Sequence, residues 1–135
     1  MDLGELRFLY VGTDDTEAAV RHCTTVMGGR LRWRFQAFGA DVAAIDLGTG
    51  APIVMLADHR PAGSVLPIYE VADLAAAEDE ARASGSHVDG PLGSPEGDAI
   101  VVRDAGGVEI ALLQVDRPGA MDGAWLDETN NHRVR

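Results

Sequence analysis

The 135-residue chain has one cysteine, no lysine, few aromatic residues and no long apolar run. The single cysteine, Cys23, excludes an intramolecular disulfide and argues against a thiolate-rich metal site. No segment approaches the roughly 20 apolar residues of a membrane-spanning helix. The N-terminal residues Met1 to Glu5 lack the basic region and apolar core of a signal peptide. We therefore expect a cytoplasmic protein that is not associated with a membrane.

All 11 cationic side chains are arginines, and they stand against 22 Asp and Glu, so the formal net charge is −11. A field of this sign repels phosphates and argues against nucleic acid as a partner. It attracts cationic small molecules, although acidity that serves only solubility is an equal alternative. The length and apolar content predict one domain with its own hydrophobic core.

The first half of the chain shows one strand, one helix and then three strands. Thr13 or Asp14 can cap the helix, and Gly28 supplies a left-handed residue that ends it. Apolar residues at helical spacing, from Ala19 to Met27, predict that the helix packs on a sheet. Short glycine-bearing loops separate the strands. The predicted elements are strand 6–11, helix 16–27 and strands 30–37, 41–47 and 52–57, with loops 38–40 and 48–51.

The same order recurs after a linker, His59 to Gly63, that contains proline and glycine. Asp73 caps the second helix and Gly85 ends it. The last two strands flank Asp104 to Gly107, which is typical of a tight hairpin turn. Pro91 and Pro95 interrupt the strand before this hairpin. The predicted elements are strand 65–71, helix 74–84 and strands 87–90, 99–103 and 108–115.

The two copies are offset by about 57 to 60 residues, which suits two fused modules. This duplicated βαβββ order resembles the vicinal oxygen chelate superfamily, which includes glyoxalases, bleomycin-resistance proteins and extradiol dioxygenases. The resemblance covers about residues 6 to 115. It implies an α+β fold in which modules at about 5–58 and 64–115 form a single domain, 1–115. A polar tail, 116–135, follows, with Trp125 as its expected anchor.

The resemblance also implies a cup in which four strands each offer one His or Glu to a divalent metal. If a strand were shifted by one residue, Glu5 or Glu109 would occupy one of these metal-ligand positions. Such a shift, however, turns every side chain of the strand to the opposite face of the sheet. Two carboxylates without imidazole would in any case be a poor transition-metal site. We therefore predict no metal and no cofactor. The four expected positions are all aliphatic: Leu6, Val54, Leu66 and Ala111.

Other reactive side chains give no catalytic set either. His59 and His132 are expected to be solvated, and His87 is a candidate for the cup. Cys23, on an apolar helix face, is more typical of a small buried hydrophobe than of a nucleophile. The segment 94–98 reads as a turn. No catalytic residue is predicted.

Alternation along the strands indicates which side chains would line the cup. The aromatic residues could stack on a planar ligand, and a place in the core or in a dimer contact is an equal alternative for each of them. The predicted ligand-binding residues are Phe8, Tyr10, Trp33, Phe35, Phe38, Ile68, Glu70, Glu109, Ala111, Leu113 and Trp125.

An acidic, aromatic-bearing cup without metal ligands is similar to the antibiotic-binding branch of the superfamily, typified by bleomycin-resistance proteins. The resemblance implies a homodimer that binds a small aromatic or cationic molecule, with antibiotic resistance by sequestration as one outcome. The cup could form within one chain or across a dimer by exchange of modules.

Two alternatives remain open. The first is an enzyme of the glyoxalase superfamily, a lyase, an isomerase or a dioxygenase-like enzyme, with an atypical or metal-free site. Glu70 or Glu109 would act as its base, with a pKa raised by apolar surroundings. The second is a protein that regulates or scaffolds a partner through Trp125 and the tail.

Overall fold

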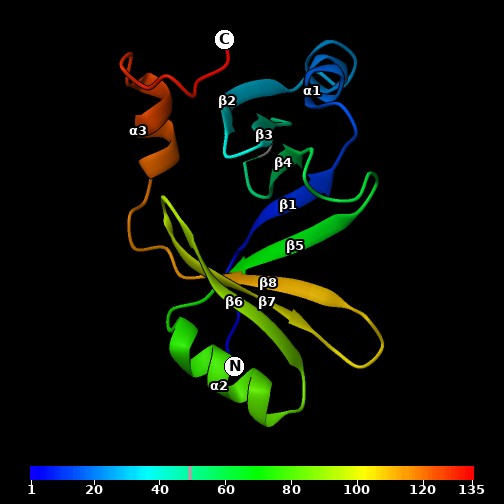
Figure 1. Cartoon of the computed structure of the whole chain (residues 1–135), viewed down its shortest axis with the longest axis vertical. Coiled ribbons are helices and arrows are strands. Elements are labelled where there is room, and N and C mark those ends of the chain that lie inside the picture. Colours follow the sequence, from blue (N-terminus) through cyan, green and yellow to red (C-terminus); the bar gives the residue numbers. More distant parts are fainter. Residues whose placement is uncertain (49) are drawn as a thin grey trace. The chain divides into compact units, whose positions relative to one another are not determined.

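The computed structural model describes residues 1–48 and 50–135, which divide into two compact units. Unit 1 comprises Met1–Arg7 and Leu66–Ala120, and unit 2 comprises Phe8–Val65 and Met121–Arg135. Thr49, in the predicted loop 48–51, lies outside the described residues. Each unit combines helix with a sheet, so the α+β class predicted from the sequence is confirmed (Figure 1).

Unit 2 contains a sheet with the strand order β2-β3-β4-β1. β1 and β4 run parallel, whereas β2, β3 and β4 pair antiparallel. In Figure 1, α1 and α3 lie on opposite sides of these strands. The elements are β1 (Leu6–Gly12), α1 (Thr16–Thr25), β2 (Arg30–Ala37), β3 (Ala40–Asp46), β4 (Ile53–Ala57) and α3 (Ala120–Leu126).

Helix α1 begins at Thr16, as predicted, but its capping residue lies one or two positions later than expected. The Asp15 carboxylate accepts a hydrogen bond from the backbone N–H of Ala18 at 3.0 Å and so caps the helix. Thr13, one of the two expected caps, instead uses its hydroxyl to accept from the Asp15 N–H at 3.2 Å. The helix ends at Thr25, and Met27, expected on its packed face, is 58% exposed.

The face of the unit-2 sheet that carries Phe8 also carries Tyr10, because both alternate with Leu9 along β1. Their partners on β4 are Ile53 and Met55. Val54, the expected fourth-strand position of the cup, pairs with Leu9 and therefore points to the other face, so this part of the predicted register was wrong by one residue.

Helix α3 covers the Phe8 face of the unit-2 sheet. Trp125 and Met121 pack against a core cluster formed by the strands, so the tail predicted from composition as polar contains an anchored helix. Trp125 is the expected anchor, and its ring meets that of Phe35 edge-on at 5.9 Å. The cluster comprises Trp33, Ala44 and Ile53, with Phe8, Phe35, Val42, Met55, Met121 and Trp125 packed against them.

After α3 the chain returns along the outer edge of β2. The N–H of Gln36 donates to the carbonyl of His132 at 2.8 Å, and the N–H of Val134 donates to the carbonyl of Arg34 at 2.9 Å. Arg133 forms an antiparallel bridge with Phe35. The last residues therefore satisfy backbone groups that an edge strand would otherwise leave unpaired.

Unit 1 contains a sheet with the order β5-β8-β7-β6, in which β5 and β8 are parallel. β6 extends beyond Pro91, where the sequence predicts an interruption, because a register shift between Asp89 and Leu92 accommodates the proline. Asp73 caps α2 as expected, accepting from the Ala76 N–H at 3.0 Å. The elements are β5 (Val65–Glu70), α2 (Leu74–Ala83), β6 (His87–Ser94), β7 (Gly97–Arg103) and β8 (Glu109–Leu113).

Helix α2 packs on one face of the unit-1 sheet, over a core that includes Ile100 and Leu112. The opposite face carries alternate residues of each strand: Ile68 pairs with Ala111, and Glu70 pairs with Leu113. Glu109 lies two residues before Ala111 and shares that face. The unit-1 residues predicted to line the cup therefore lie together on one sheet face.

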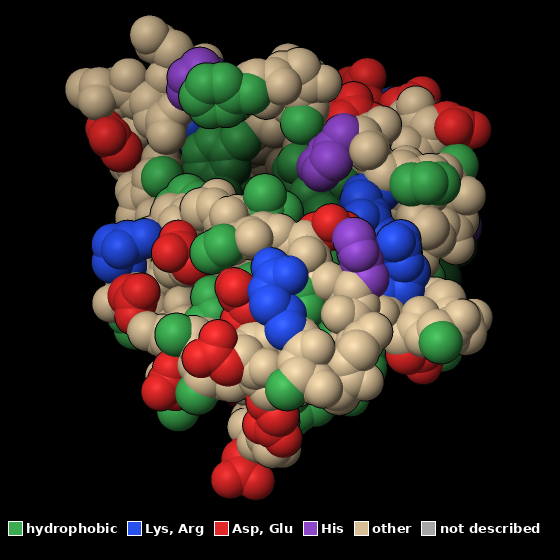
Figure 2. Space-filling view, turned by 60° about the horizontal axis from the view of Figure 1, so that its bottom comes forward, with side chains coloured by type: hydrophobic (Ala, Val, Ile, Leu, Met, Phe, Trp, Pro, Cys, Tyr) green, Lys and Arg blue, Asp and Glu red, His purple; other side chains and the backbone are tan. Residues whose placement is uncertain are grey.

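None of the helices in the described ranges is long and apolar enough to cross a membrane. Asp and Glu side chains are spread over the face shown in Figure 2 rather than gathered in one patch.

Candidate functional site

Two polar side chains meet at the end of β1. The Tyr10 hydroxyl lies 2.9 Å from Nε2 of His59, and their ring centroids are 5.5 Å apart. Tyr10 is one of the predicted ligand-binding residues. His59 is exposed, as expected from the sequence, but it also contacts Tyr10, a partner that the sequence did not reveal.

The pairing follows from the parallel strands. β1 and β4 end at the same edge of the sheet, with Gly12 opposite Ala57, so the residues that follow Ala57 come back beside Tyr10. A His-Arg pair one residue after a buried strand is the sequence signal for this site. The proline and glycine that follow it indicate only a linker.

Because residue 12 is a glycine, the linker after His59 can lie close against the end of β1. A Cβ there would lie 2.0 Å from the carbonyl oxygen of Pro61, a distance no side chain tolerates. The N–H of Gly12 donates to the Ser64 carbonyl at 2.9 Å, and the N–H of Gly63 donates to the Gly12 carbonyl at 3.0 Å. The segment after His59 is therefore fixed against the strand that carries Tyr10.

Burial raises the pKa of Tyr10 to about 12; the charge of Arg60 opposes this shift and the charge of Asp58 adds to it. The phenol therefore keeps its proton at neutral pH. It can donate a hydrogen bond to a ligand oxygen while accepting one from His59.

Arg60 adds a cation beside this pair. Its Nε is buried and has no hydrogen-bond partner among the described residues. A buried N–H without an acceptor is costly and rare in folded proteins. The group is suited to an oxygen atom of a ligand, above all one that gains negative charge.

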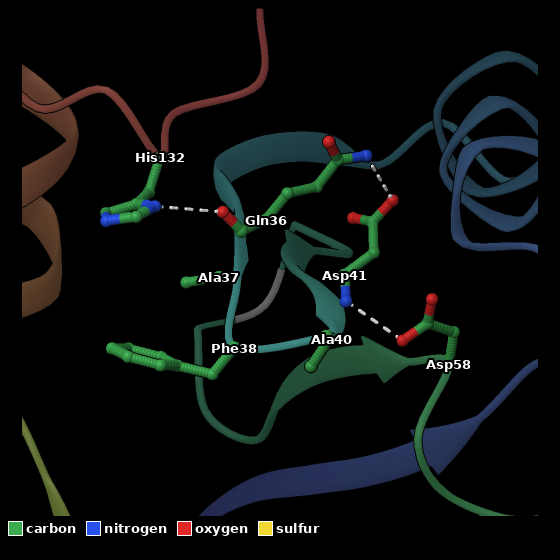
Figure 3. A pocket seen from close by; sticks show the side chains of 8 residues that line it. Gln36, Ala37, Phe38, Ala40, Asp41, Asp58 and His132 are labelled. Carbon is green, nitrogen blue, oxygen red and sulfur yellow. Dashed lines mark hydrogen bonds between the residues drawn. The ribbon is translucent and has the colours of Figure 1, made fainter.

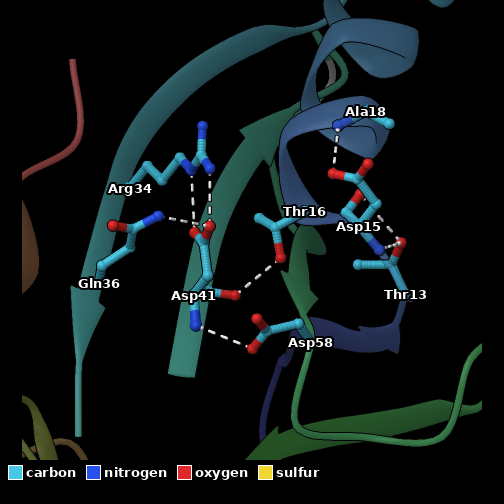
Figure 4. A network of polar contacts seen from close by, with 8 residues as sticks. All are labelled: Thr13, Asp15, Thr16, Ala18, Arg34, Gln36, Asp41 and Asp58. Atoms are coloured by element: carbon cyan, nitrogen blue, oxygen red, sulfur yellow. Dashed lines mark hydrogen bonds and ion pairs between the residues drawn. The ribbon is translucent and has the colours of Figure 1, made fainter. Parts of the chain in front are cut away.

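A network on β2 and β3 fixes the other side of the linker (Figure 4). The guanidinium of Arg34 donates to both oxygens of Asp41, at 2.9 and 2.6 Å. Gln36 also donates to Asp41 at 2.9 Å. These hydrogen bonds, led by that from Arg34, hold the pKa of Asp41 below its usual value. The N–H of Asp41 in turn donates to the carboxylate of Asp58 at 2.9 Å, which orients the residue before His59.

Apart from Tyr10, the predicted aromatic residues separate into two groups. In the first, Trp125 of α3 packs with Phe8, Trp33 and Phe35 of the sheet, and Trp33 is only 6% exposed. Phe38 lies apart from them at the turn between β2 and β3, where its side chain is fully exposed at 102%.

In unit 1, the sheet face opposite α2 holds an ion cluster that the sequence did not reveal. Arg7 lies 3.4 Å from a carboxylate oxygen of Glu70 and 3.6 Å from Oε1 of Glu96. Glu96 is 8% exposed, although it lies in the predicted turn 94–98. Glu70, one of the two carboxylates considered as a base, is paired with Arg7.

The positions implied for metal ligands carry no histidine, aspartate or glutamate. The helix caps Asp15 and Asp73 are equivalent in the two modules. Counting back from them makes Phe8, rather than Leu6, the counterpart of Leu66. With Met55 in place of Val54, the unit-2 positions are Phe8 and Met55, and those of unit 1 remain Leu66 and Ala111. None of these side chains has an imidazole or a carboxylate. Among the described residues, no group of three or more His, Cys, Asp and Glu is placed to hold an ion.

No protein-family model matches the sequence, and no curated protein matches it significantly. Solved structures do match the fold. Methylmalonyl-CoA epimerase from Mycobacterium tuberculosis is 17% identical, with a TM-score of 0.72 over 85% of this chain and 90% of that one.

Streptomyces coelicolor methylmalonyl-CoA epimerase, in complex with 2-nitronate-propionyl-CoA, is 18% identical, with a TM-score of 0.70 over 86% of this chain and 100% of that one. A hypothetical protein from Bacillus halodurans is 10% identical, with a TM-score of 0.70 over 84% and 95%. The chain therefore has the vicinal oxygen chelate fold, as its duplicated βαβββ order predicts.

Proposed function

We propose that the protein is a metal-independent enzyme of the isomerase or lyase kind, which moves a proton on the carbon next to a carbonyl group. The observation that carries the proposal is the Tyr10–His59 hydrogen bond of 2.9 Å beside Arg60. Of the two main functions that the sequence left open, the enzyme is also the one that the structural neighbours favour, because they are epimerases.

The protonation of Tyr10 and His59 suits this chemistry. In the tautomer that carries a proton on Nε2, His59 donates to the Tyr10 oxygen, and its Nδ1 lone pair is left as a base. Tyr10 retains its own proton, because its pKa is raised to about 12. One side chain can therefore accept a proton while its neighbour donates a hydrogen bond to the substrate.

The proposed step is a reversible proton transfer that needs no oxidant or reductant. His59 removes the proton from the α-carbon, and the electron pair of that C–H bond forms the enolate double bond. The negative charge collects on the former carbonyl oxygen, where the hydroxyl of Tyr10 and the guanidinium of Arg60 stabilise it. Return of the proton to the other face gives the epimer.

The proposed substrate class follows from this arrangement. The step requires an acidic C–H, such as one between a thioester and a carboxylate, because no metal is assigned to polarise the carbonyl. Methylmalonyl-CoA, named for the neighbouring epimerases, has such a carbon. We take it as the first probe, together with a 2-oxo acid and a 2-hydroxy ketone.

Drug sequestration has less support. It requires aromatic rings that are free to stack on a planar molecule, and three of the predicted rings, those of Trp33, Phe35 and Trp125, pack on one another or on the sheet. These contacts favour a place in the core for them.

The test is exchange of the α-hydrogen of each probe in deuterium oxide, followed by NMR. We expect exchange above the uncatalysed rate with at least one probe, unchanged by a chelator. His59→Gln and Tyr10→Phe should each slow it by roughly 10² or more, a usual contribution of acid–base catalysis.

His22→Gln is the matched control, because His22 is an exposed histidine on α1 outside the site. It should retain full activity. Exchange that is abolished by the chelator, or that survives in His59→Gln, would contradict the proposal. So would the absence of exchange with all three probes.

A further inference from the structure

A second feature of unit 2 is not used by the proposed reaction. An open hollow of about 520 Å³ lies at the turn between β2 and β3, where the final residues of the chain run beside β2. This volume is within the range of small-molecule sites. Its lining comprises residues 36–41, Asp58 and His132 (Figure 3).

The ring of Phe38 is held at the rim in an unusual state. The backbone of Phe38 has a φ of +53°, a left-handed conformation that a bulky residue seldom adopts. Its side chain is 102% exposed, although glycine or asparagine would serve such a turn without exposing an apolar ring. Two unfavourable features at one residue point to a role outside the fold itself.

His132 supports this ring from the tail. The two rings stack at 6.2 Å between centroids, with 28° between their planes. His132 is fixed at two points, since its carbonyl accepts from the N–H of Gln36 at 2.8 Å and its Nδ1 lies 3.2 Å from the carbonyl of Gln36. The tail therefore helps to build the aromatic side of the hollow.

The other side of the hollow is anionic. The carboxylate of Asp41 is occupied by Arg34 and Gln36, so its charge is largely compensated. Asp58 differs: its Oδ1 accepts from the N–H of Asp41, and its carboxylate has no other hydrogen bond and no ion pair among the described residues. In Figure 3 the side chains of Phe38 and Asp58 lie on either side of Ala40. A ligand in the hollow meets an aromatic ring at one end and a carboxylate at the other.

We propose that this hollow binds a flat organic cation, whose ring stacks on Phe38 and whose charged nitrogen lies near Asp58. The net charge of −11 favours the approach of such a ligand. The site does not depend on proton transfer, because neither Tyr10 nor His59 lines the hollow.

The test compares two probes of nearly equal shape, N-methylquinolinium, which is permanently charged, and neutral quinoline. Titration calorimetry should show that the cation binds at least 5-fold more tightly. Asp58→Asn should remove most of this preference, because an amide oxygen can still accept from Asp41 but carries no charge. Phe38→Gly should weaken the binding of both probes by at least 5-fold, and glycine suits the backbone at this position.

Three controls separate the possible outcomes. Glu128→Gln, an equal charge change at an exposed residue of unit 2, should leave both affinities unchanged. Val26→Ala, at another exposed apolar side chain, should do the same. Tyr10→Phe should slow the proposed exchange reaction but leave the binding of the cation unchanged, so failure of one proposal is distinguishable from failure of the other.

The proposal is overturned if quinoline binds as tightly as N-methylquinolinium, or if neither binds at millimolar concentration. It is also overturned if Phe38→Gly binds both probes as the unaltered protein does. A change in the sedimentation of Phe38→Gly, without a change in binding, would assign the ring to a contact between two copies of the chain instead.

Discussion

Unit 1 and unit 2 each consist of a helix packed on one face of a four-stranded sheet, and they differ on the other face. In unit 2 that face carries aromatic side chains, and α3 covers them. In unit 1 it carries aliphatic residues and the cluster of Arg7, Glu70 and Glu96. The repeated βαβββ order therefore determines the backbone of each module, whereas the residues on the sheet face opposite the first helix of each unit differ between the two.

The two units also gain stability from different interactions. In unit 1, Gly97 is buried, and the carbonyl of Gln114, just after β8, lies close to its backbone. Unit 2 has the partly buried Arg34–Asp41 ion pair and the aromatic packing under α3. Substitutions at these points test the comparison, because each should act through the interaction of its own unit.

Gly97→Ala should have the largest effect. A Cβ at Gly97 would lie 1.8 Å from the carbonyl oxygen of Gln114, and the φ of +153° adds backbone strain. Overpacking and strain of this kind together cost about 3 to 5 kcal/mol. Chemical denaturation should show this loss of unfolding free energy. A loss below about 1 kcal/mol would mean that the two backbones do not approach as described.

Arg34→Ala should have the next largest effect. It leaves the carboxylate of Asp41 without its main partner, and the two side chains are only 11% and 13% exposed. Breaking such a pair costs about 3 kcal/mol. Arg32→Ala is the matched control: Arg32 pairs with Asp122, but these side chains are 41% and 44% exposed, so the loss should be under about 1 kcal/mol.

The Arg34–Asp41 pair also predicts a pH dependence. Because Arg34 lowers the pKa of Asp41 in the folded state, the pair contributes fully above the ordinary carboxyl value of about 4. The contribution is lost as the pH falls through the folded-state pKa. The difference in stability between the unaltered protein and Arg34→Ala should therefore be large at pH 7 and shrink in acid. A difference that is constant down to pH 2 would be inconsistent with ionic pairing.

Trp125→Ala should have a smaller effect, of about 2 to 3 kcal/mol, because the ring is only half-buried. It loses the contact with Phe35 and the guanidinium of Arg135, which lies 4.3 Å from the ring centroid. Leu126→Ala, at a 75% exposed neighbour on the same helix, should change stability by less than about 0.5 kcal/mol. Equal losses in the two variants would mean that α3 is not held by its tryptophan.

Gly123→Ala should have the smallest effect and the opposite sign. Gly123 lies inside α3, and a Cβ there meets no atom within 4 Å. Alanine favours a helix interior by up to about 1 kcal/mol over glycine. A small rise in the midpoint of thermal unfolding would show that α3 can be stabilised without a new contact.

The sequence predicted the fold well because its signals are local and occur twice. Asp73 before an apolar stripe and Gly85 after it define α2 within about a residue of the prediction. The errors have specific causes. Asp15, rather than Thr13 or Asp14, caps α1, and a register shift carries β6 past Pro91.

The candidate site was harder to predict, because it depends on which segments meet. Tyr10 was selected from strand alternation, which is local. His59 and Arg60 belong to a segment that reads as a linker, and only the parallel pairing of β1 and β4 brings them beside Tyr10. Glu96 was hidden for a similar reason, because its burial depends on where Arg7 lies.

The pairing of residues 132–134 with β2 has a consequence for self-association. Without these residues, the backbone groups of β2 that now bond to His132 and Val134 would face solvent as an open strand edge. Such edges recruit strands from other molecules and begin aggregation. Residues 132–134 therefore protect the edge of β2 from pairing with other molecules. Proteolytic removal of the residues after Trp125 is expected to promote aggregation.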